Sequence, residues 1–224
     1  IAYIARTISE RLRDQGMRIV LIAGPSSSGK TTFSKRLSIQ LLAHGLRPFT
    51  LEMDNYFVDR EKTPRDEDGG YDFEALETLN LPLLNEQFAA LIAGEQVITP
   101  KFDFLTGKSL PDRPSQLKDN QIIIAEGIHG LNPRLLTEIP NDKVYRVYVS
   151  ALTQLNIDFH NRVPTTDVRL LRRIARDAAR RGYSATDTIL RWDSVRRGEK
   201  KNIFPFQENA DVMFNSALAY ELAA

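Results

Sequence analysis

The stretch Ile22-Ala-Gly-Pro-Ser-Ser-Ser-Gly-Lys-Thr-Thr32 decides the fold of this chain. Its segment GPSSSGKT, residues 24–31, matches the pattern G-x-x-x-x-G-K-[S/T] at every fixed position. The aliphatic run at residues 18–23 precedes it and predicts a buried strand, and apolar residues at helical spacing follow over residues 31–44. In such a loop the backbone N–H groups converge on phosphate oxygens, and glycine leaves the necessary room. The stretch therefore predicts a triphosphate-binding loop between a strand and a helix.

This loop predicts ATP and Mg²⁺ as ligands. The Lys30 ammonium has the length to reach the β- and γ-phosphates, and the Thr31 hydroxyl is a suitable Mg²⁺ ligand. An ordinary Gly/Ser loop that caps a helix is the alternative reading. The predicted nucleotide-binding residues are Gly24, Ser26, Ser27, Ser28, Gly29, Lys30, Thr31 and Thr32.

Composition favours one globular domain over residues 1–224. The chain is 42% hydrophobic and 26% charged, with a formal net charge of +1, so no overall field favours nucleic acid or a membrane. Cysteine is absent, which permits a reducing compartment, and no apolar run reaches transmembrane length. We expect a cytoplasmic protein. Because a helical pattern begins at Ile1 without a methionine, we also expect the natural protein to extend upstream.

Strand and helix patterns alternate along the chain. This alternation predicts an α/β protein with a mostly parallel sheet covered by helices on both faces, and together with the phosphate loop it predicts the P-loop NTPase fold. We place a loop and hairpin at about residues 55–110, on the side where the molecule that accepts the phosphate would bind. We place an arginine-rich helical lid at about residues 160–183. The predicted strands are 48–53, 97–105, 121–125, 144–149 and 211–214, and the predicted helices are 82–93, 166–181, 185–197 and a last one at the C-terminus.

Carboxylates follow two of the predicted strands. Asp54 follows the strand at 48–53, and Glu126 follows the strand at 121–125. Ligands of open α/β sheets bind beyond the carboxyl ends of the strands. There Asp54 could accept the proton of an acceptor hydroxyl, and both carboxylates could hold Mg²⁺. A turn-forming Asp-Asn pair and a solvated strand end are the alternative readings.

The predicted lid helix carries a stripe of arginines. Arg169, Arg172, Arg173, Arg176 and Arg180 are spaced by 3, 1, 3 and 4 and therefore share one helix face. Arginine suits bidentate contact with phosphate oxygens and stabilises charge on a transferring phosphoryl group. We assign phosphate contacts to three of them, Arg169, Arg173 and Arg176, and a solvated cationic face is the alternative.

Charge is distributed unevenly between two segments. Residues 52–77 carry ten acidic and three basic side chains, whereas residues 161–201 carry twelve basic and five acidic ones. The two segments could face each other across a cleft or form two separate solvated surfaces.

The order of motifs resembles one family of kinases. The phosphate loop is followed by MDNYF, YDFE, KFDF, IIIAEGIHG and TDVRLLRRIARDAARRG, and together they are similar to the uridine kinase and phosphoribulokinase group of P-loop kinases. The resemblance runs from Ile19 to about Ala217. It is closest to a bacterial uridine or nucleoside kinase subgroup in which this domain follows a region similar to part of threonyl-tRNA synthetase.

The resemblance implies transfer of the γ-phosphate of ATP to the 5′-hydroxyl of a pyrimidine nucleoside, in pyrimidine salvage. It implies that Asp54 is the catalytic base, that Glu126 and Thr31 hold Mg²⁺, and that Asp72 binds the ribose. Arg169 and Arg176 would meet phosphates or the acceptor. The remaining acceptor-side residues that we assign are Tyr56, Phe102, Phe104 and Arg162.

One motif departs from the family pattern. Uridine-cytidine kinases show Tyr-Asp-Phe, two further residues and a histidine, whereas this chain has Phe102-Asp103-Phe104 followed by Leu-Thr-Gly. A base could still stack on Phe102 or Phe104. Two alternatives therefore stay open: a kinase of another small hydroxyl compound, such as a sugar phosphate, pantothenate or glycerate, and a regulatory module that binds ATP without turnover. The expected partner is a small acceptor molecule, and homo-oligomerisation is left open.

Overall fold

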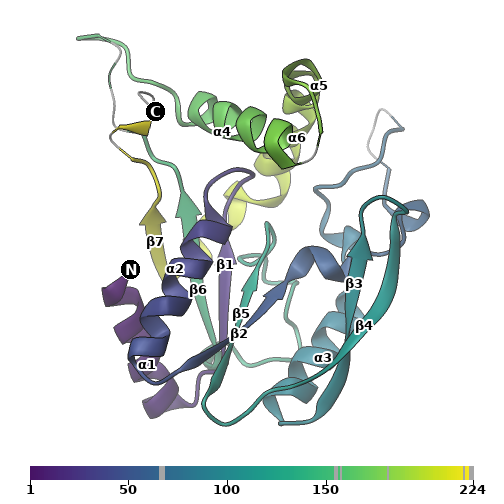
Figure 1. Cartoon of the computed structure of the whole chain (residues 1–224), viewed down its shortest axis with the longest axis vertical. Coiled ribbons are helices and arrows are strands. Elements are labelled where there is room, and N and C mark those ends of the chain that lie inside the picture. Colours follow the sequence, from purple (N-terminus) through teal and green to yellow (C-terminus); the bar gives the residue numbers. More distant parts are fainter. Residues whose placement is uncertain (66–68, 154–155, 157, 181, 219, 222–224) are drawn as a thin grey trace.

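A five-stranded parallel sheet forms the centre of the molecule (Figure 1). The computed structural model describes residues 1–65, 69–153, 156, 158–180, 182–218 and 220–221. The strands lie in the order β2–β5–β1–β6–β7, which confirms the predicted fold class. They comprise β1 (Ile19–Ala23), β2 (Arg47–Glu52), β5 (Gln121–Glu126), β6 (Val144–Ser150) and β7 (Val212–Asn215).

Helices cover both faces of this sheet. On one face α1 (Ala2–Gln15) and α2 (Lys30–Ala43) pack against β1, β5 and β6 through Ile8, Phe33 and Leu37. On the other face α3 (Leu81–Ile92) contributes Leu84 and Phe88 to a second core. All five residues of β1 are buried, as expected of a central parallel strand. Among the described residues, no helix has the length and apolar content needed to cross a membrane.

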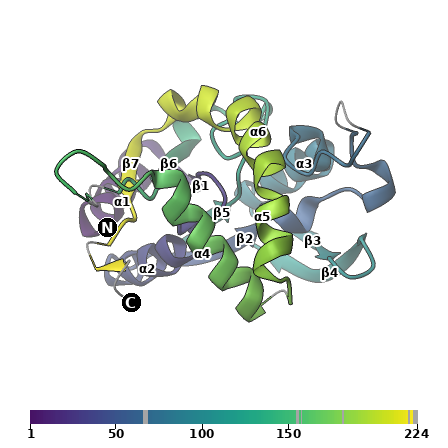
Figure 2. The ribbon, with the colours of Figure 1, turned by 90° about the horizontal axis from the view of Figure 1, so that it is seen from above.

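Three helices lie beyond the carboxyl ends of the strands. They are α4 (Thr165–Arg180), α5 (Ala185–Leu190) and α6 (Trp192–Asn202). Figure 2 shows α4 crossing above the sheet. This is the place that a lid over the phosphate loop would occupy.

An antiparallel hairpin stands beside the sheet (Figure 1). It consists of β3 (Gln96–Asp103) and β4 (Lys108–Gln116), with a register shift between Thr99 and Pro100. The exposed strand predicted at 97–105 is confirmed as β3. The second strand of the expected hairpin is β4, whose bounds were not predicted because Pro111 and Pro114 disfavour a strand except at an exposed edge.

One prediction about helices was wrong in detail, and a second falls partly outside the described residues. The single helix expected at 185–197 is divided at Arg191 into α5 and α6, and Trp192 is buried where the second helix begins. The helix expected after β7 is not seen at residues 216–218, and part of that segment lies outside the described residues. Short 3-10 helices complete the structure: Met53–Tyr56, Arg60–Lys62, Leu76–Thr78, Asn141–Lys143 and Phe204–Asn209.

Candidate active site

The register of the sheet brings three strand ends together. Glu126 of β5 is the register partner of Ile22 in β1 and of Glu52 in β2. The phosphate loop begins directly after β1, and Asp54 lies two residues beyond β2. The segments that follow β2 and β5 also touch, because a Cβ on Gly127 would lie 2.6 Å from the Met53 sulfur. Loop, Glu126 and Asp54 therefore share one edge of the sheet, as predicted.

The backbone of the phosphate loop has the shape that an anion cradle needs. Gly24 has φ 149°, and a Cβ there would lie 2.1 Å from the Val149 carbonyl oxygen, so only glycine fits. Ser27 has φ 57° and Gly29 has φ 92°, both in the left-handed region that is rare for residues with a side chain. Alternation of this kind turns successive N–H groups towards one point. Helix α2 begins at Lys30 and adds its positive end.

Unsatisfied groups in the loop fit a phosphate ligand. Among the described residues, the buried hydroxyl oxygens of Ser27 and Ser28 have no hydrogen-bond partner. The Lys30 ammonium donates to the carbonyls of Gly24 and Pro25, at 2.9 and 3.2 Å. Burial lowers the pKa of Lys30, and the carboxylates of Glu126, Asp54 and Glu74 oppose that shift. A bound triphosphate would supply hydrogen-bond acceptors for the side chains of Ser27, Ser28 and Lys30.

Thr31 and Glu126 form a pair of hard oxygen donors. The Thr31 hydroxyl lies 2.8 and 3.0 Å from the two carboxylate oxygens of Glu126. Burial raises the pKa of Glu126, while the Thr31 hydrogen bond and the Lys30 charge act against it. In the described part of the chain, no three His, Cys, Asp or Glu side chains form a metal cluster. Mg²⁺ suits such a place, because it takes few protein ligands and completes its shell with phosphate and water.

Asp54 stands on the acceptor side of the loop. It lies in the 3-10 helix Met53–Tyr56, is half-buried, and interacts electrostatically with Lys30 and Glu126. Met53 and Tyr56 are buried on either side of it and hold this helical turn in the core. This anchored turn therefore places Asp54 within electrostatic range of Lys30 and Glu126.

In the described part of the α4 stripe, Arg169 is buried and Arg172, Arg173 and Arg176 are half-buried. Arg173 donates to the Ser26 hydroxyl of the phosphate loop at 2.8 Å. Arg176 donates to Asp177, which is buried, and Leu171 is exposed on the outer side. Arg173 of α4 thus contacts the phosphate loop directly. Arg180 is at the end of the helix, and its side chain lies outside the described residues.

The charge of Arg169 is paired with Glu199 and does not contact the phosphate loop directly. The Arg169 side chain is buried and lies 2.6 Å from a Glu199 carboxylate oxygen, with the guanidinium 5.4 Å from the Trp192 ring centre. The same Glu199 oxygen accepts the N–H of Ser26 at 3.2 Å. The expected phosphate contact of Arg169 is therefore corrected for this structure: a carboxylate of α6 stands between it and the loop.

This pair gives a prediction about stability. Arg169→Met should lower the free energy of unfolding by about 3–5 kcal/mol, because the Glu199 charge would remain buried without its partner. Arg173→Met, at a less buried pair, should instead reduce phosphoryl transfer with a small effect on stability. Thermal unfolding and initial rates of both variants separate the two roles. A stable Arg169→Met variant with a large loss of rate would contradict the structural assignment.

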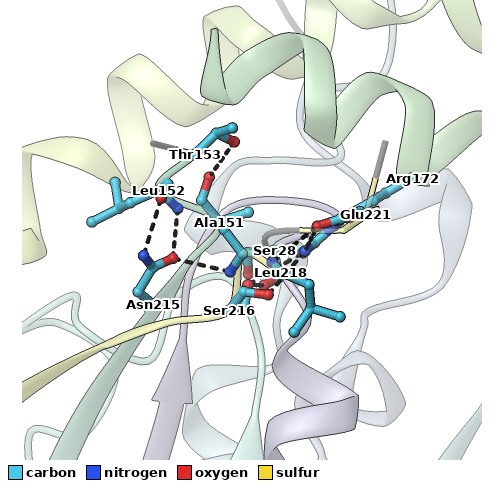
Figure 3. A network of polar contacts seen from close by, with 10 residues as sticks. Ser28, Ala151, Leu152, Thr153, Arg172, Asn215, Ser216, Leu218 and Glu221 are labelled. Carbon is cyan, nitrogen blue, oxygen red and sulfur yellow. Dashed lines mark hydrogen bonds and ion pairs between the residues drawn. The ribbon is translucent and has the colours of Figure 1, made fainter. Parts of the chain in front are cut away.

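The segment at the end of β7 and beyond it forms hydrogen bonds with both α4 and the phosphate loop (Figure 3). The Ser216 hydroxyl donates to the Ser28 carbonyl, and Arg172 of α4 donates to the Ser216 carbonyl at 2.9 Å. Arg172 also forms an ion pair with Glu221. Asn215 exchanges hydrogen bonds of 3.0 Å with the backbone of Leu152 beyond β6. The C-terminal segment therefore belongs to the surroundings of the nucleotide site.

Tyr56 is not available to a ligand. It is 1% exposed, and its hydroxyl donates to the Gln87 side chain of α3 at 3.0 Å. Its ring packs edge-on against Phe88 at 6.2 Å between centres. The prediction that Tyr56 binds the acceptor is wrong in this structure, because the 3-10 turn that carries Asp54 directs the tyrosine into the core.

Three aromatic rings form a cluster on the acceptor side. Phe102 is buried, whereas Phe104 is 57% exposed, and their centres lie 5.2 Å apart. Phe57 meets both rings edge-on at 5.5 and 6.4 Å. The exposed ring of Phe104 offers the stacking surface, and Phe102 supports it from behind.

The structure separates the last two acceptor residues. Asp72 accepts the N–H of Glu74 at 3.1 Å and so shapes the turn at residues 72–75. Arg162 is exposed and pairs with Asn156 in an isolated bridge. The described part of the chain between β6 and α4, which includes Asn156 and Arg162, lies on the β7 side of the molecule, away from the hairpin (Figure 1). Arg162 is thus not brought to the acceptor side, because the chain leaves β6 in the opposite direction.

Two carboxylates of the site were missed in the sequence. Glu199 reaches the phosphate loop from α6, and Glu74 interacts electrostatically with Arg173, Lys30 and Glu199. The acidic segment and the basic segment therefore meet at this site. Glu74 belongs to the YDFE motif, which could have drawn attention to it. Glu199 is one acidic residue among many basic ones, and no motif or spacing marks it as a site residue.

The chain is similar in sequence and fold to known kinases. Uridine kinase of Staphylococcus aureus (strain JH9) is 29% identical over 196 residues, covering 87% of this chain and 86% of that protein. Uridine kinase of Saccharomyces cerevisiae is 26% identical over 206 residues, and the match covers 88% of this chain but 36% of that protein. The structure of D-glycerate 3-kinase from Cryptococcus neoformans var. grubii has a TM-score of 0.59 at 17% identity, covers 94% of this chain and 88% of that one, and shows the shared fold. The model of the Phosphoribulokinase / Uridine kinase family matches residues 19–222, and the chain therefore belongs to this family of P-loop kinases.

Proposed function

We propose that this chain transfers the γ-phosphate of ATP to the 5′-hydroxyl of a nucleoside, with uridine or cytidine as acceptor. The observation that carries the proposal is the position of Asp54 opposite a phosphate loop whose Lys30 it interacts with. A module that only binds ATP has no need of an acceptor-side carboxylate at this place. The uridine kinases among the relatives support a nucleoside as the acceptor.

In this mechanism the chain's own groups hold the reactants and move one proton. The acceptor hydroxyl gives its proton to the Asp54 carboxylate as its oxygen forms a bond with the γ-phosphorus. The bond from phosphorus to the bridging oxygen breaks, and ADP leaves. Lys30 would exchange the carbonyls of Gly24 and Pro25 for phosphate oxygens, where its charge stabilises the transition state.

Membership of this kinase family implies the use of ATP and Mg²⁺. The ion would be held by Thr31 and Glu126, with Asp54 beside them. When bound, Mg²⁺ neutralises charge on the phosphate oxygens. Arg173 is poised to contribute a further positive charge from the lid, since it already contacts the Ser26 hydroxyl.

A nucleobase could stack on the exposed ring of Phe104. Because the family tyrosine and histidine are replaced around Phe102, the hydrogen bonds to the base edge must come from elsewhere. This departure favours a second candidate, a kinase of another small hydroxyl compound such as a sugar phosphate, pantothenate or glycerate.

The two candidates are separated by the identity of the acceptor. ADP release should be measured with MgATP and a panel of nucleosides, neutral sugars, sugar phosphates, pantothenate and glycerate. We expect uridine or cytidine to give the highest kcat/KM. A preference for any other class of acceptor would overturn the nucleoside assignment, and binding of ATP without turnover on any acceptor would favour the regulatory module.

A further inference from the structure

A carboxylate of helix α6 lies against the backbone of the phosphate loop. Glu199 is fully buried, and its Oε1 atom accepts the N–H of Ser26 at 3.2 Å. Because Pro25 has no N–H, Ser26 carries the first backbone donor of the loop after Gly24. Backbone N–H groups of such a loop are the donors that phosphate oxygens use. The proposed mechanism gives no role to a negative side chain at this place.

Two helices above the sheet meet the loop at the same residue. Glu199 of α6 accepts the Ser26 N–H, and Arg173 of α4 donates to the Ser26 hydroxyl at 2.8 Å. Arg169 of α4 joins the two helices to each other, because its guanidinium donates to both Glu199 oxygens at 2.6 and 2.5 Å. Ser26 is therefore the point at which α4, α6 and the phosphate loop are connected.

Cations surround the Glu199 carboxylate as they would surround a phosphate. Besides Arg169, it interacts electrostatically with Lys30 of the loop and with Arg196, one turn earlier on α6. Lys30 is the side chain to which we assign the β- and γ-phosphates. Glu199 thus uses a backbone N–H and a lysine charge of the kind that bind a triphosphate in such a loop.

We propose that Glu199 competes with the phosphates of ATP for this loop. Its carboxylate leaves Ser26 when a triphosphate takes the loop donors, because two anions this close repel each other strongly in a buried site. Arg169 and Arg196 stay beside Glu199 and keep its charge paired. Part of the binding free energy of ATP is therefore used to displace Glu199, and the contact of α6 with the loop opens as the nucleotide binds. The proposal requires ATP as the ligand of the loop, but no particular acceptor.

The first test is the ATP affinity of a variant that loses the charge and keeps the shape of the side chain. Glu199→Gln should bind MgATP about 10-fold more tightly than the wild-type protein in isothermal titration calorimetry, because the neutral amide does not repel phosphate. If Glu199 only supported the loop, the same variant would bind MgATP more weakly. Asp193→Asn is the matched control: Asp193 is exposed in the first turn of α6, and its loss should leave the Kd unchanged.

The second test uses the wild-type protein, because Glu199→Gln leaves Arg169 buried without an anion and is expected to be less stable. The chain has one tryptophan, Trp192, and the Arg169 guanidinium lies 5.4 Å from the centre of its ring. Displacement of Glu199 changes the charges beside this ring. The fluorescence emission of Trp192 should therefore change as MgATP is added and saturate according to the Kd from calorimetry. Adenosine, which has no phosphate, should leave the emission unchanged.

The results that would overturn the proposal are distinct from those that bear on the acceptor. MgATP binding by folded Glu199→Gln that equals or falls below that of the wild-type protein would contradict the competition. Trp192 emission that ignores MgATP, or that responds equally to adenosine, would contradict the displacement. Both tests are made without an acceptor, so a preference for an acceptor other than a nucleoside would overturn the nucleoside assignment and leave the role of Glu199 standing.

Discussion

Replacing Asp54 by asparagine should reduce kcat for phosphoryl transfer by about 10²- to 10⁴-fold, the range associated with loss of a general base. The amide keeps the size of the side chain but cannot take the proton of the acceptor hydroxyl. Because Asp54 sits on the 3-10 turn beyond β2 and not in the phosphate loop, the Kd for ATP should change little. Single-turnover transfer and equilibrium nucleotide binding measure the two effects separately.

An exposed aspartate serves as the control for this variant. Asp14 lies in α1, on a helix that packs against the sheet away from the strand ends, and Asp14→Asn should leave rate and binding unchanged. A loss of ATP binding that equals the loss of rate in Asp54→Asn would show that Asp54 supports the fold of the site. That result would remove the acceptor-side base from the account.

Replacing Lys30 by alanine should weaken both ATP binding and turnover. The ammonium is the one charged group that the phosphate loop itself contributes, and removal of an electrostatic stabiliser of this kind typically lowers kcat by about 10²- to 10³-fold. We expect a rise in the KM for ATP in addition, because the same charge contacts the phosphates in the ground state. Steady-state kinetics with varied ATP at saturating acceptor give both constants.

The matched control for Lys30 lies on the same helix. Lys35 is exposed on α2, one turn and a half further on, and Lys35→Ala removes a lysine without touching the loop. It should behave as the wild-type protein does. An unchanged rate in Lys30→Ala would contradict the assignment of the phosphate loop itself.

The sequence predicted the parts of the fold that depend on local pattern. A fully apolar strand, a glycine-rich loop and an amphipathic helix in succession specified β1, the loop and α2, and carboxylates after two other strands pointed to Asp54 and Glu126. Parallel strand ends necessarily meet at one edge, so these residues came together as expected. Hydrophobic spacing along α4 likewise indicated which face its arginines would share.

The errors arose where long-range partners decide the role of a side chain. Arg169 and Arg173 lie on the same face of a helical wheel. Glu199, thirty residues after Arg169 in the sequence, forms an ion pair with Arg169, whereas Arg173 donates to Ser26. Tyr56 follows Asp54 closely and yet points into the core, because a 3-10 turn separates the directions of neighbouring side chains. Neither distinction is encoded in periodicity or in motif spacing.

Glu74 shows the same limit from the opposite side. Its motif was visible, but only the contact with Gly198 and the unpartnered oxygen reveal that its carboxylate is enclosed within the site. Packing of α6 against the acceptor side creates this environment, and the sequence indicates nothing of it, because Gly198 lies just beyond the end of the helix predicted at 185–197.

A crystal structure of the protein with a non-hydrolysable ATP analogue, Mg²⁺ and uridine tests the central claim most directly. The account predicts the triphosphate against the amides of residues 27–31, with Lys30 moved from the Gly24 carbonyl to a phosphate oxygen. It also predicts the uridine 5′-hydroxyl within hydrogen-bond reach of Asp54. A nucleotide bound elsewhere, or a uridine hydroxyl directed away from Asp54 beside a correctly bound nucleotide, would contradict it.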